Sequence, residues 1–278
     1  MLIDTHSHLN FSVFKETFNK IIKECFLQNI QIINVGTKYE TSEKALEIAK
    51  MYKEGVYAAV GLHPIHLETG LVKIKDDTQE IEIKTKEENF NYEKYKNLAK
   101  DKKVVAIGEI GFDFYWTPKS KEKKEILEEK QKENFILQLE LARELNLPII
   151  LHCRLANKEM LTILKNYKNK IRGVIHCFVG TLKDLEEYLK LDFFIGFNGI
   201  IFKNIEGIDF KEIILNTPLN KILLETDCPY FTPLGFDEKI NNPLGLPLIA
   251  KEIAKIKNIS FEQISNITTQ NAKELFSL

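Results

Sequence analysis

Eight short apolar runs, rich in β-branched residues, alternate along this chain with longer segments of helical period. The runs cover residues 2–8, 31–36, 56–62, 104–109, 148–153, 173–178, 193–198 and 222–227. Several are apolar on both faces, which is typical of buried parallel strands. Strand and helix alternating eight times predict an α/β fold, a (β/α)8 TIM barrel forming a single domain over residues 1–278. An open doubly wound sheet is the alternative, because closure leaves no local mark in a sequence.

Helical patterns fill the gaps between the runs. In the first gap, apolar residues at spacings of three and four predict a helix, namely Phe14, Phe18, Ile21, Ile22, Cys25 and Phe26. The other helical patterns cover residues 41–53, 91–101, 119–146, 156–168, 181–190, 209–215 and 246–257. Ser260 and Gln263 have the spacing of a capping box, which predicts the start of a last helix.

The connection after the third run is longer than an ordinary barrel loop. Residues 67–90 contain two alternating runs on either side of Asp76-Asp77-Thr78, which predicts an inserted β-hairpin. Such a loop rises from the catalytic end of a barrel, so its lysines can extend a substrate groove. A hairpin with no part in binding is the alternative, because loops tolerate insertions.

Charge and cysteine content limit the function classes. With 39 basic and 40 acidic side chains the net charge is -1, so any nucleic-acid site must be local. The four cysteines include no Cys-x-x-Cys pair, which is typical of a reduced protein. The sequence contains neither a membrane-spanning apolar run nor a signal-peptide pattern, and no obligate protein partner is evident. These features predict a cytoplasmic protein.

Six residues of metal-ligand type stand at the predicted carboxyl ends of five strands. His6 and His8 end the first strand, and alternation places them on one face with Asp4. The others are Glu109, His152, His176 and Asp227. Since barrel active sites lie at this end of the strands, we expect all six to meet. Such a set matches two adjacent divalent ions, Zn, Mn or Mg, that share one carboxylate, although each residue alone could be an ordinary buried polar group.

Further residues near these ends have expected roles. Glu225 shares the inward face of Asp227, so we expect it to support the catalytic metal shell by hydrogen bonding. His63 ends the third strand as a catalytic or substrate-contact candidate, whereas we place His66 on the surface. Tyr115 and Arg154 are candidate substrate contacts, with packing under a loop as the alternative for the aromatic residue. The cysteines that follow His152, His176 and Asp227 should face the helices rather than a metal.

As a set, these motifs resemble the TatD family of metal-dependent hydrolases, within the amidohydrolase-like barrels. The segments that carry the resemblance are Asp4-Thr5-His6-Ser7-His8-Leu9, Gly61-Leu62-His63-Pro64, Gly108-Glu109-Ile110-Gly111-Phe112-Asp113, His152-Cys153-Arg154, His176-Cys177-Phe178-Val179-Gly180, Glu225-Thr226-Asp227-Cys228-Pro229-Tyr230 and Asn271-Ala272-Lys273-Glu274-Leu275-Phe276. The resemblance implies a divalent-metal hydrolase, commonly a deoxyribonuclease, whose ligands match the six residues above. The family's basic segment ending in Asn-Glu-Pro is replaced here by residues 235–243, so phosphate contacts fall to Arg154, lysines and the metals.

These observations predict a phosphodiesterase that uses metal-activated water, acting on DNA ends or single strands. We expect Glu109 to bridge the ions and Asp227 to move a proton. A carbonyl hydrolase, such as a deacylase or amidohydrolase on a small substrate or a mis-charged tRNA, is the first alternative, since the same nucleophile attacks carbonyl carbon. A catalytically silent metal-binding scaffold is the second.

Overall fold

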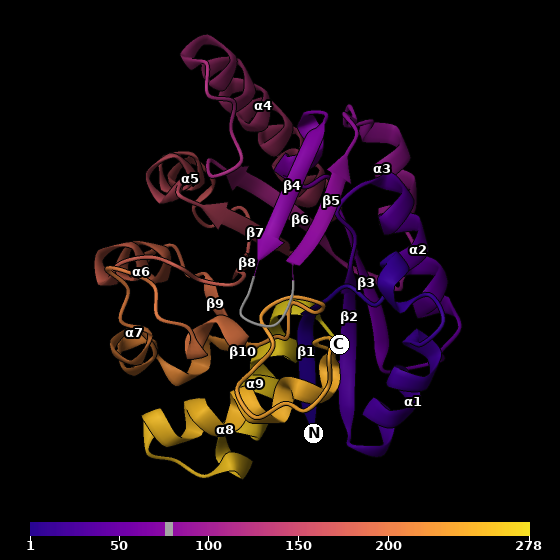
Figure 1. Cartoon of the computed structure of the whole chain (residues 1–278), viewed down its shortest axis with the longest axis vertical. Coiled ribbons are helices and arrows are strands. Elements are labelled where there is room, and N and C mark those ends of the chain that lie inside the picture. The colour runs from indigo at the N-terminus through magenta and orange to yellow at the C-terminus, as the bar shows by residue number, and fades with distance from the viewer. Residues whose placement is uncertain (76–79) are drawn as a thin grey trace.

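Eight parallel strands form the central sheet of the protein, in the order β1-β2-β3-β6-β7-β8-β9-β10 (Figure 1). The computed structural model describes residues 1–75 and 80–278, without the side chains of 71–84. The strands are β1 (Leu2–Ser7), β2 (Ile30–Val35), β3 (Val56–Val60), β6 (Val104–Asp113), β7 (Ile149–Arg154), β8 (Gly173–Ile175), β9 (Phe194–Phe197) and β10 (Ile222–Leu224). Backbone hydrogen bonds from His8 to Cys228 (3.1 Å) and from Asp227 to His6 (2.8 Å) join the last strand's extension to the first. The predicted (β/α)8 barrel is therefore confirmed, nearly closed and in one domain.

Helices follow the strands as the sequence predicts. They are α1 (Phe18–Leu27), α2 (Tyr39–Lys50), α3 (Tyr92–Ala99), α4 (Lys121–Leu145), α5 (Asn157–Leu164), α6 (Leu182–Lys190), α7 (Phe210–Asn216), α8 (Leu246–Lys257) and α9 (Phe261–Phe276). The capping box of Ser260 and Gln263 starts α9 as expected, with hydrogen bonds of 2.9 and 3.1 Å. Among the helices that the structure describes, none is both long enough and apolar enough to cross a membrane.

The insertion after β3 contains two antiparallel strands, β4 (Gly70–Lys75) and β5 (Glu80–Thr85), which lie in front of the barrel in the view of Figure 1. Its base is held by α4, because the Lys130 ammonium donates to the Leu67 carbonyl at 2.8 Å and pairs with Glu87. At the same base the Glu88 amide donates to the His66 carbonyl at 2.8 Å. The insertion thus begins and ends beside the segment that carries His63.

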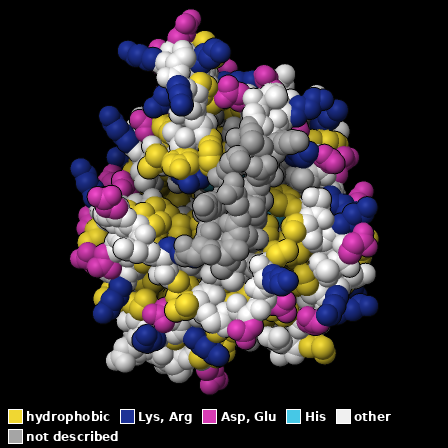
Figure 2. Space-filling view, in the orientation of Figure 1, with side chains coloured by type: hydrophobic (Ala, Val, Ile, Leu, Met, Phe, Trp, Pro, Cys, Tyr) yellow, Lys and Arg dark blue, Asp and Glu magenta, His cyan; other side chains and the backbone are white. Residues whose placement is uncertain are grey.

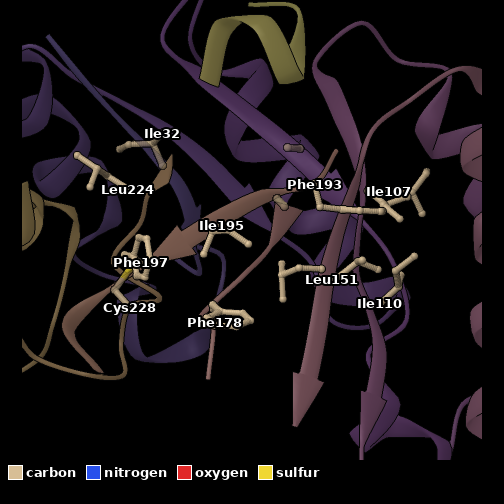
Figure 3. Close-up of a cluster of buried hydrophobic side chains, with 14 of the residues drawn as sticks. Ile32, Ile107, Ile110, Leu151, Phe178, Phe193, Ile195, Phe197, Leu224 and Cys228 are labelled. Carbon is tan, nitrogen blue, oxygen red and sulfur yellow. The ribbon is translucent and has the colours of Figure 1, made fainter. Parts of the chain in front are cut away.

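The hydrophobic core has two layers. The smaller cluster takes at least one side chain from each barrel strand, so it fills the barrel interior: Ile3, Ile33, Val35, Ala59, Val105, Ala106, Ile150, Val174, Phe194 and Leu223. Leu275 and Phe276 of α9 belong to the same cluster. The larger cluster lies between strands and helices, and Figure 3 shows part of it on β2, β6, β7, β9 and β10. Apolar side chains thus fill the barrel interior near the start of the strands, and the buried polar side chains lie at the carboxyl ends.

Candidate metal centre

A β-bulge in β1 turns His6, and His8 just beyond the strand, toward the barrel axis. The four residues from Asp4 to Ser7 lie opposite three residues of β2, so alternation breaks inside β1. His6 and His8 consequently reach the centre described below, whereas the Asp4 carboxylate accepts hydrogen bonds from the Thr226 hydroxyl (2.6 Å) and amide (2.9 Å). The expectation that Asp4 shares the face of the histidines is wrong, because strict alternation does not survive a bulge.

A second bulge, in β6, aims Glu109 inward. The four residues from Ile107 to Ile110 lie opposite three residues of β7. Gly108 permits this close approach, since a Cβ there would lie 2.6 Å from the Cβ of Ile150. The strand also runs on to Asp113, four residues beyond the end that the sequence predicts. Glu109 therefore lies within a buried strand rather than at its exposed tip.

Glu109 lies between two groups of histidines. Its Oε2 is 3.4 Å from His6 Nε2 and 3.8 Å from His8 Nε2. Its Oε1 is 2.9 Å from His152 Nδ1 and 3.2 Å from His176 Nε2. One carboxylate oxygen thus faces each group, which is the arrangement expected of a carboxylate that bridges two adjacent ions.

Asp227 completes the first group. Its Oδ1 lies 3.4 Å from His8 Nε2 and 3.8 Å from His6 Nε2. Three sets of donor atoms are close enough to hold an ion, namely His6 with His8 and Asp227, His6 with Glu109 and His176, and His63 with Glu109 and His152. The structure therefore brings together all six residues that the sequence predicts as ligands, with His63 beside them.

Hydrogen bonds at Nδ1 determine which ring nitrogen of His8 and His176 is left to bind an ion. Nδ1 of His8 is 2.9 Å from the Val35 carbonyl, and Nδ1 of His176 is 3.1 Å from Oε1 of Glu225. Both oxygens only accept, so Nδ1 is the donor in each ring, and Nε2 is the nitrogen left to bind an ion. Partners of this kind orient metal-binding histidines and raise their basicity.

Glu225 has the supporting position that its sequence spacing predicts. Besides His176, its Oε1 accepts hydrogen bonds from the Cys177 amide (2.6 Å) and the Asn198 side chain (3.2 Å). Its neighbour Gly196 leaves room for the carboxylate, because a Cβ there would lie 2.5 Å from Oε2. Asn198 is a supporting residue that sequence patterns did not reveal, since it contacts Glu225 only through the fold.

His63 has the opposite arrangement of protons. Its Nδ1 accepts a hydrogen bond from the Ile65 amide at 3.0 Å, so the proton of the neutral ring is on Nε2. Burial lowers the pKa of His63, which favours that neutral form. Nε2 lies 3.3 Å from Oε1 of Glu109 and donates toward it. His63 therefore offers a hydrogen bond to the centre and has no free lone pair for an ion.

The carboxylates of the centre are ionised. Burial by itself raises the pKa of Glu109, but the nearby imidazoles of His63, His176 and His6 outweigh it and hold that pKa well below its ordinary value. The pKa of Asp227 is also lowered, because His176, His8 and His6 together outweigh its burial. The centre therefore presents two negative charges in a buried site, which divalent cations would neutralise.

Metal affinity should fall as the pH falls. Burial lowers the pKa of His176, but Glu225 and Glu109 raise it well above the ordinary value, and Asp113 and Glu109 likewise raise that of His152. Both rings thus hold protons at a higher pH than a free imidazole does, and an ion must displace them. We expect ion affinity, measured by chelator competition, to fall from about pH 8 to about pH 6 by up to tenfold per unit for each proton displaced. An affinity independent of pH in this range would contradict that prediction.

The cysteines beside the ligands lie apart from these donor sets. Cys153 lines the cavity above the centre, but its thiol contacts the helices as expected, Asn157 of α5 at 3.3 Å and Tyr188 of α6 at 3.6 Å. Cys177 follows the end of β8 with a φ of +46°, so strand alternation does not describe it, and it lines the cavity above the centre. We expect Cys153→Ala and Cys177→Ala to retain the metal content of the parent by mass spectrometry. Loss of an ion from either folded variant would assign a thiolate to the metal site.

A cavity of about 1800 Å³ opens above the centre and is lined by all three predicted substrate contacts, His63, Tyr115 and Arg154. The Arg154 guanidinium lies 3.9 Å from the centroid of the Tyr115 ring and 5.8 Å from that of Trp116, a cation–π arrangement. Tyr115 is 52% exposed, so packing under a loop does not explain it. His66 was expected on the surface and is instead buried, because it lies in a short 3-10 helix with Nε2 3.3 Å from the Thr37 hydroxyl.

The sequence pattern of the family described as TatD related DNase matches residues 3–277 of the chain. The chain belongs to this family. It is 37% identical to YabD of Bacillus subtilis, named an uncharacterized metal-dependent hydrolase, over 281 residues that cover 100% of both proteins. It is 29% identical to the 3'-5' ssDNA/RNA exonuclease TatD of Escherichia fergusonii, with 100% of the chain and 99% of that protein covered. Its fold matches that of YJJV, a TatD homologue from Escherichia coli K12, with a TM-score of 0.83 and 27% identity over 100% of the chain and 98% of that structure.

As a TatD-family protein, the chain is a metal-dependent hydrolase. Its histidine, glutamate and aspartate groups at the carboxyl end of the barrel can bind metal. The ligand-type residues within the segments that carry the resemblance thus meet in space.

Proposed function

We propose that this TatD-family hydrolase cleaves phosphodiester bonds at the ends of single-stranded DNA, with two divalent ions bound around Glu109. The observation that carries the proposal is the position of that carboxylate between two histidine groups. In this proposal His6, His8 and Asp227 would hold one ion, and His152 and His176 the second. Zn, Mn or Mg bound there would supply activated water and offset charge on the phosphate.

The side chains around the ions have separate tasks in this proposal. Glu109 holds the two ion positions together, and Glu225 keeps His176 oriented through its 3.1 Å hydrogen bond. Asp227, which its lowered pKa leaves ionised, would accept the proton of the attacking water at a carboxylate oxygen and pass it to the leaving oxygen. His63 donates from Nε2 to a phosphoryl oxygen or to the leaving oxygen.

The shape of the cavity supports a polymeric substrate. Its volume of about 1800 Å³ exceeds the roughly 300–1,000 Å³ of pockets for small ligands. Tyr115 offers an exposed ring on which a base can stack, and Arg154 beside it can contact a backbone phosphate. The similarity to a protein named as an ssDNA/RNA exonuclease supports the same substrate class.

Electrostatic attraction for the substrate would be local. Basic and acidic side chains intermingle on the face drawn in Figure 2, in agreement with the net charge of -1. Two divalent ions would exceed the charge of Glu109 and Asp227, so the centre itself would attract a phosphate once loaded. Binding would then depend on the loaded centre and its cavity wall rather than on a broad basic surface.

The test uses chelator-treated protein, reloaded separately with Mg, Mn or Zn. Each preparation is assayed on end-labelled single-stranded DNA, on a small phosphodiester, and on ester and amide substrates. We expect metal-dependent cleavage of DNA and the diester. Turnover of the ester or amide substrates alone would favour the carbonyl hydrolase, and full metal occupancy without any turnover would favour the silent scaffold.

Shortening the hairpin should affect the oligonucleotide more than the small diester. We expect replacement of residues 72–86 by a short turn to leave diester hydrolysis within a few-fold of the parent while raising the Michaelis constant for an oligonucleotide and lowering its salt dependence. Lys73, Lys75 and Lys84, on which this expectation depends, have side chains outside the described residues, whereas Lys86 is exposed.

The trimmed protein keeps the base of the insertion, including Glu87, Glu88 and Leu67, so its melting temperature serves as the control for folding. Unchanged oligonucleotide kinetics and salt dependence would show that the hairpin has no part in binding.

A further inference from the structure

Asp113, at the end of β6, uses its two carboxylate oxygens for different neighbours. Oδ2 lies 3.1 Å from Nε2 of His152. Oδ1 accepts hydrogen bonds from the backbone amides of Tyr115 (3.0 Å) and Trp116 (3.1 Å). The side chain is buried at 2% exposure, so these contacts are its main compensation for leaving water.

The contact with His152 determines which ring nitrogen carries a proton. A carboxylate only accepts hydrogen bonds, so Nε2 of His152 donates to Asp113. Nδ1 lies on the other side of the ring, 2.9 Å from Oε1 of Glu109, and is therefore the nitrogen that gives up its proton when an ion binds there. Reversing the proton positions would place N–H where a ligand is needed.

The contact with the two amides determines the position of Tyr115 and Trp116, which form an aromatic wall of the cavity. An aspartate that accepts from amides two and three residues further on closes a local turn. This turn carries the Tyr115 ring, which lies beneath the Arg154 guanidinium at 3.9 Å. Arg154 lies opposite Asp113 in the backbone register of β6 and β7. The Arg154 carbonyl accepts a hydrogen bond from the Phe114 amide at 2.9 Å.

We propose that Asp113 is a positioning residue that sets the metal-binding form of His152 with one oxygen and holds the Tyr115–Trp116 wall with the other. This role rests on the proposed function only in taking His152 as a metal ligand. It makes the wall and the metal centre depend on a single buried carboxylate, so substrate contacts and ion binding share one support.

Asparagine at this position separates the two tasks. The amide oxygen of Asp113→Asn can still accept from the two backbone amides, while its NH2 group faces Nε2 of His152 and donates to it. His152 is then protonated at Nδ1, toward Glu109, and has no lone pair for an ion there. Asp113→Ala loses both tasks.

Two readouts follow these tasks independently of turnover. Ion affinity is measured by chelator competition, and the wall is followed by fluorescence and quenching of Trp116, the chain's single tryptophan. We expect Asp113→Asn to bind ions about 10–100-fold more weakly with parental Trp116 fluorescence. Asp113→Ala should show the same loss of affinity together with altered fluorescence. Asp184→Asn is the matched control, because its carboxylate bonds to Thr181, and it should change neither readout.

The outcomes separate this inference from the proposed function. An Asp113→Asn protein that binds ions as tightly as the parent overturns the role for His152, and an Asp113→Ala protein with parental fluorescence overturns the role for the wall. A parent that binds ions but does not cleave DNA contradicts the proposed function and leaves the positioning role supported if the variants behave as above. A parent that binds no ion overturns both.

Discussion

Replacing Glu109 with alanine is expected to lower kcat/KM for the diester by about a thousandfold or more, which corresponds to about 4 kcal/mol of transition-state stabilisation. The reason is geometric, since among the carboxylates that the structure describes this one alone makes close contacts with both histidine groups, with His6 Nε2 at 3.4 Å and His176 Nε2 at 3.2 Å. Without it the two ions would lose their shared ligand and the buried imidazoles their main counter-charge. Metal content per chain and kcat/KM are the two measurements.

Glu109→Gln is the matched control for size. The amide fills the same space but lacks the charge that attracts the ions, so we expect it to lose activity almost as fully as alanine does. Both variants should keep the far-UV circular dichroism of the parent, because the barrel interior is filled by apolar side chains from all eight strands. Retained turnover with two bound ions in a folded Glu109→Ala protein would contradict the bridging role.

The fold was predictable because its signal is repeated. Eight apolar runs separated by helical patterns are redundant, so an error of a few residues at one strand end leaves the architecture unchanged. Strands β8 and β10 illustrate this, because they end at Ile175 and Leu224, three residues earlier than predicted. His176 and Asp227 nevertheless lie at the carboxyl end of the barrel, beside the other ligand-type residues.

The direction in which individual side chains point was less predictable. Glu225 and Asp227 both reach the centre as expected, but not through alternation, because β10 ends at Leu224 and Asp227 has a φ of +53°. Alternation failed at Asp4, because a bulge in β1 depends on pairing with β2 rather than on local sequence. Asp113 was missed for a related reason. The apolar run predicts a strand that ends at Glu109, whereas the two-residue spacing from Glu109 through Gly111 to Asp113 is the signal that places both carboxylates on one face of a longer strand.

Proton positions on the histidines were beyond reach of the sequence. The partner of His176 is 49 residues away and that of His152 is 39 residues away, so only the fold brings them into contact. His63 differs, because its partner is the Ile65 amide in the turn that follows it. Because of that local contact, His63 presents an N–H group to the centre, whereas the neighbouring histidines present the nitrogens that would bind ions.

His63→Phe is therefore expected to lower kcat by about a hundredfold without loss of bound metal. Phenylalanine retains the ring shape but removes the Nε2 proton that lies 3.3 Å from Oε1 of Glu109. The matched control is His152→Phe, which removes a lone pair instead of a donor and should lose an ion as well as activity. Metal analysis and single-turnover rates on the same preparations distinguish the two. If His63→Phe loses an ion while folded, His63 is a ligand, and the proton assignment that follows from the Ile65 hydrogen bond is wrong.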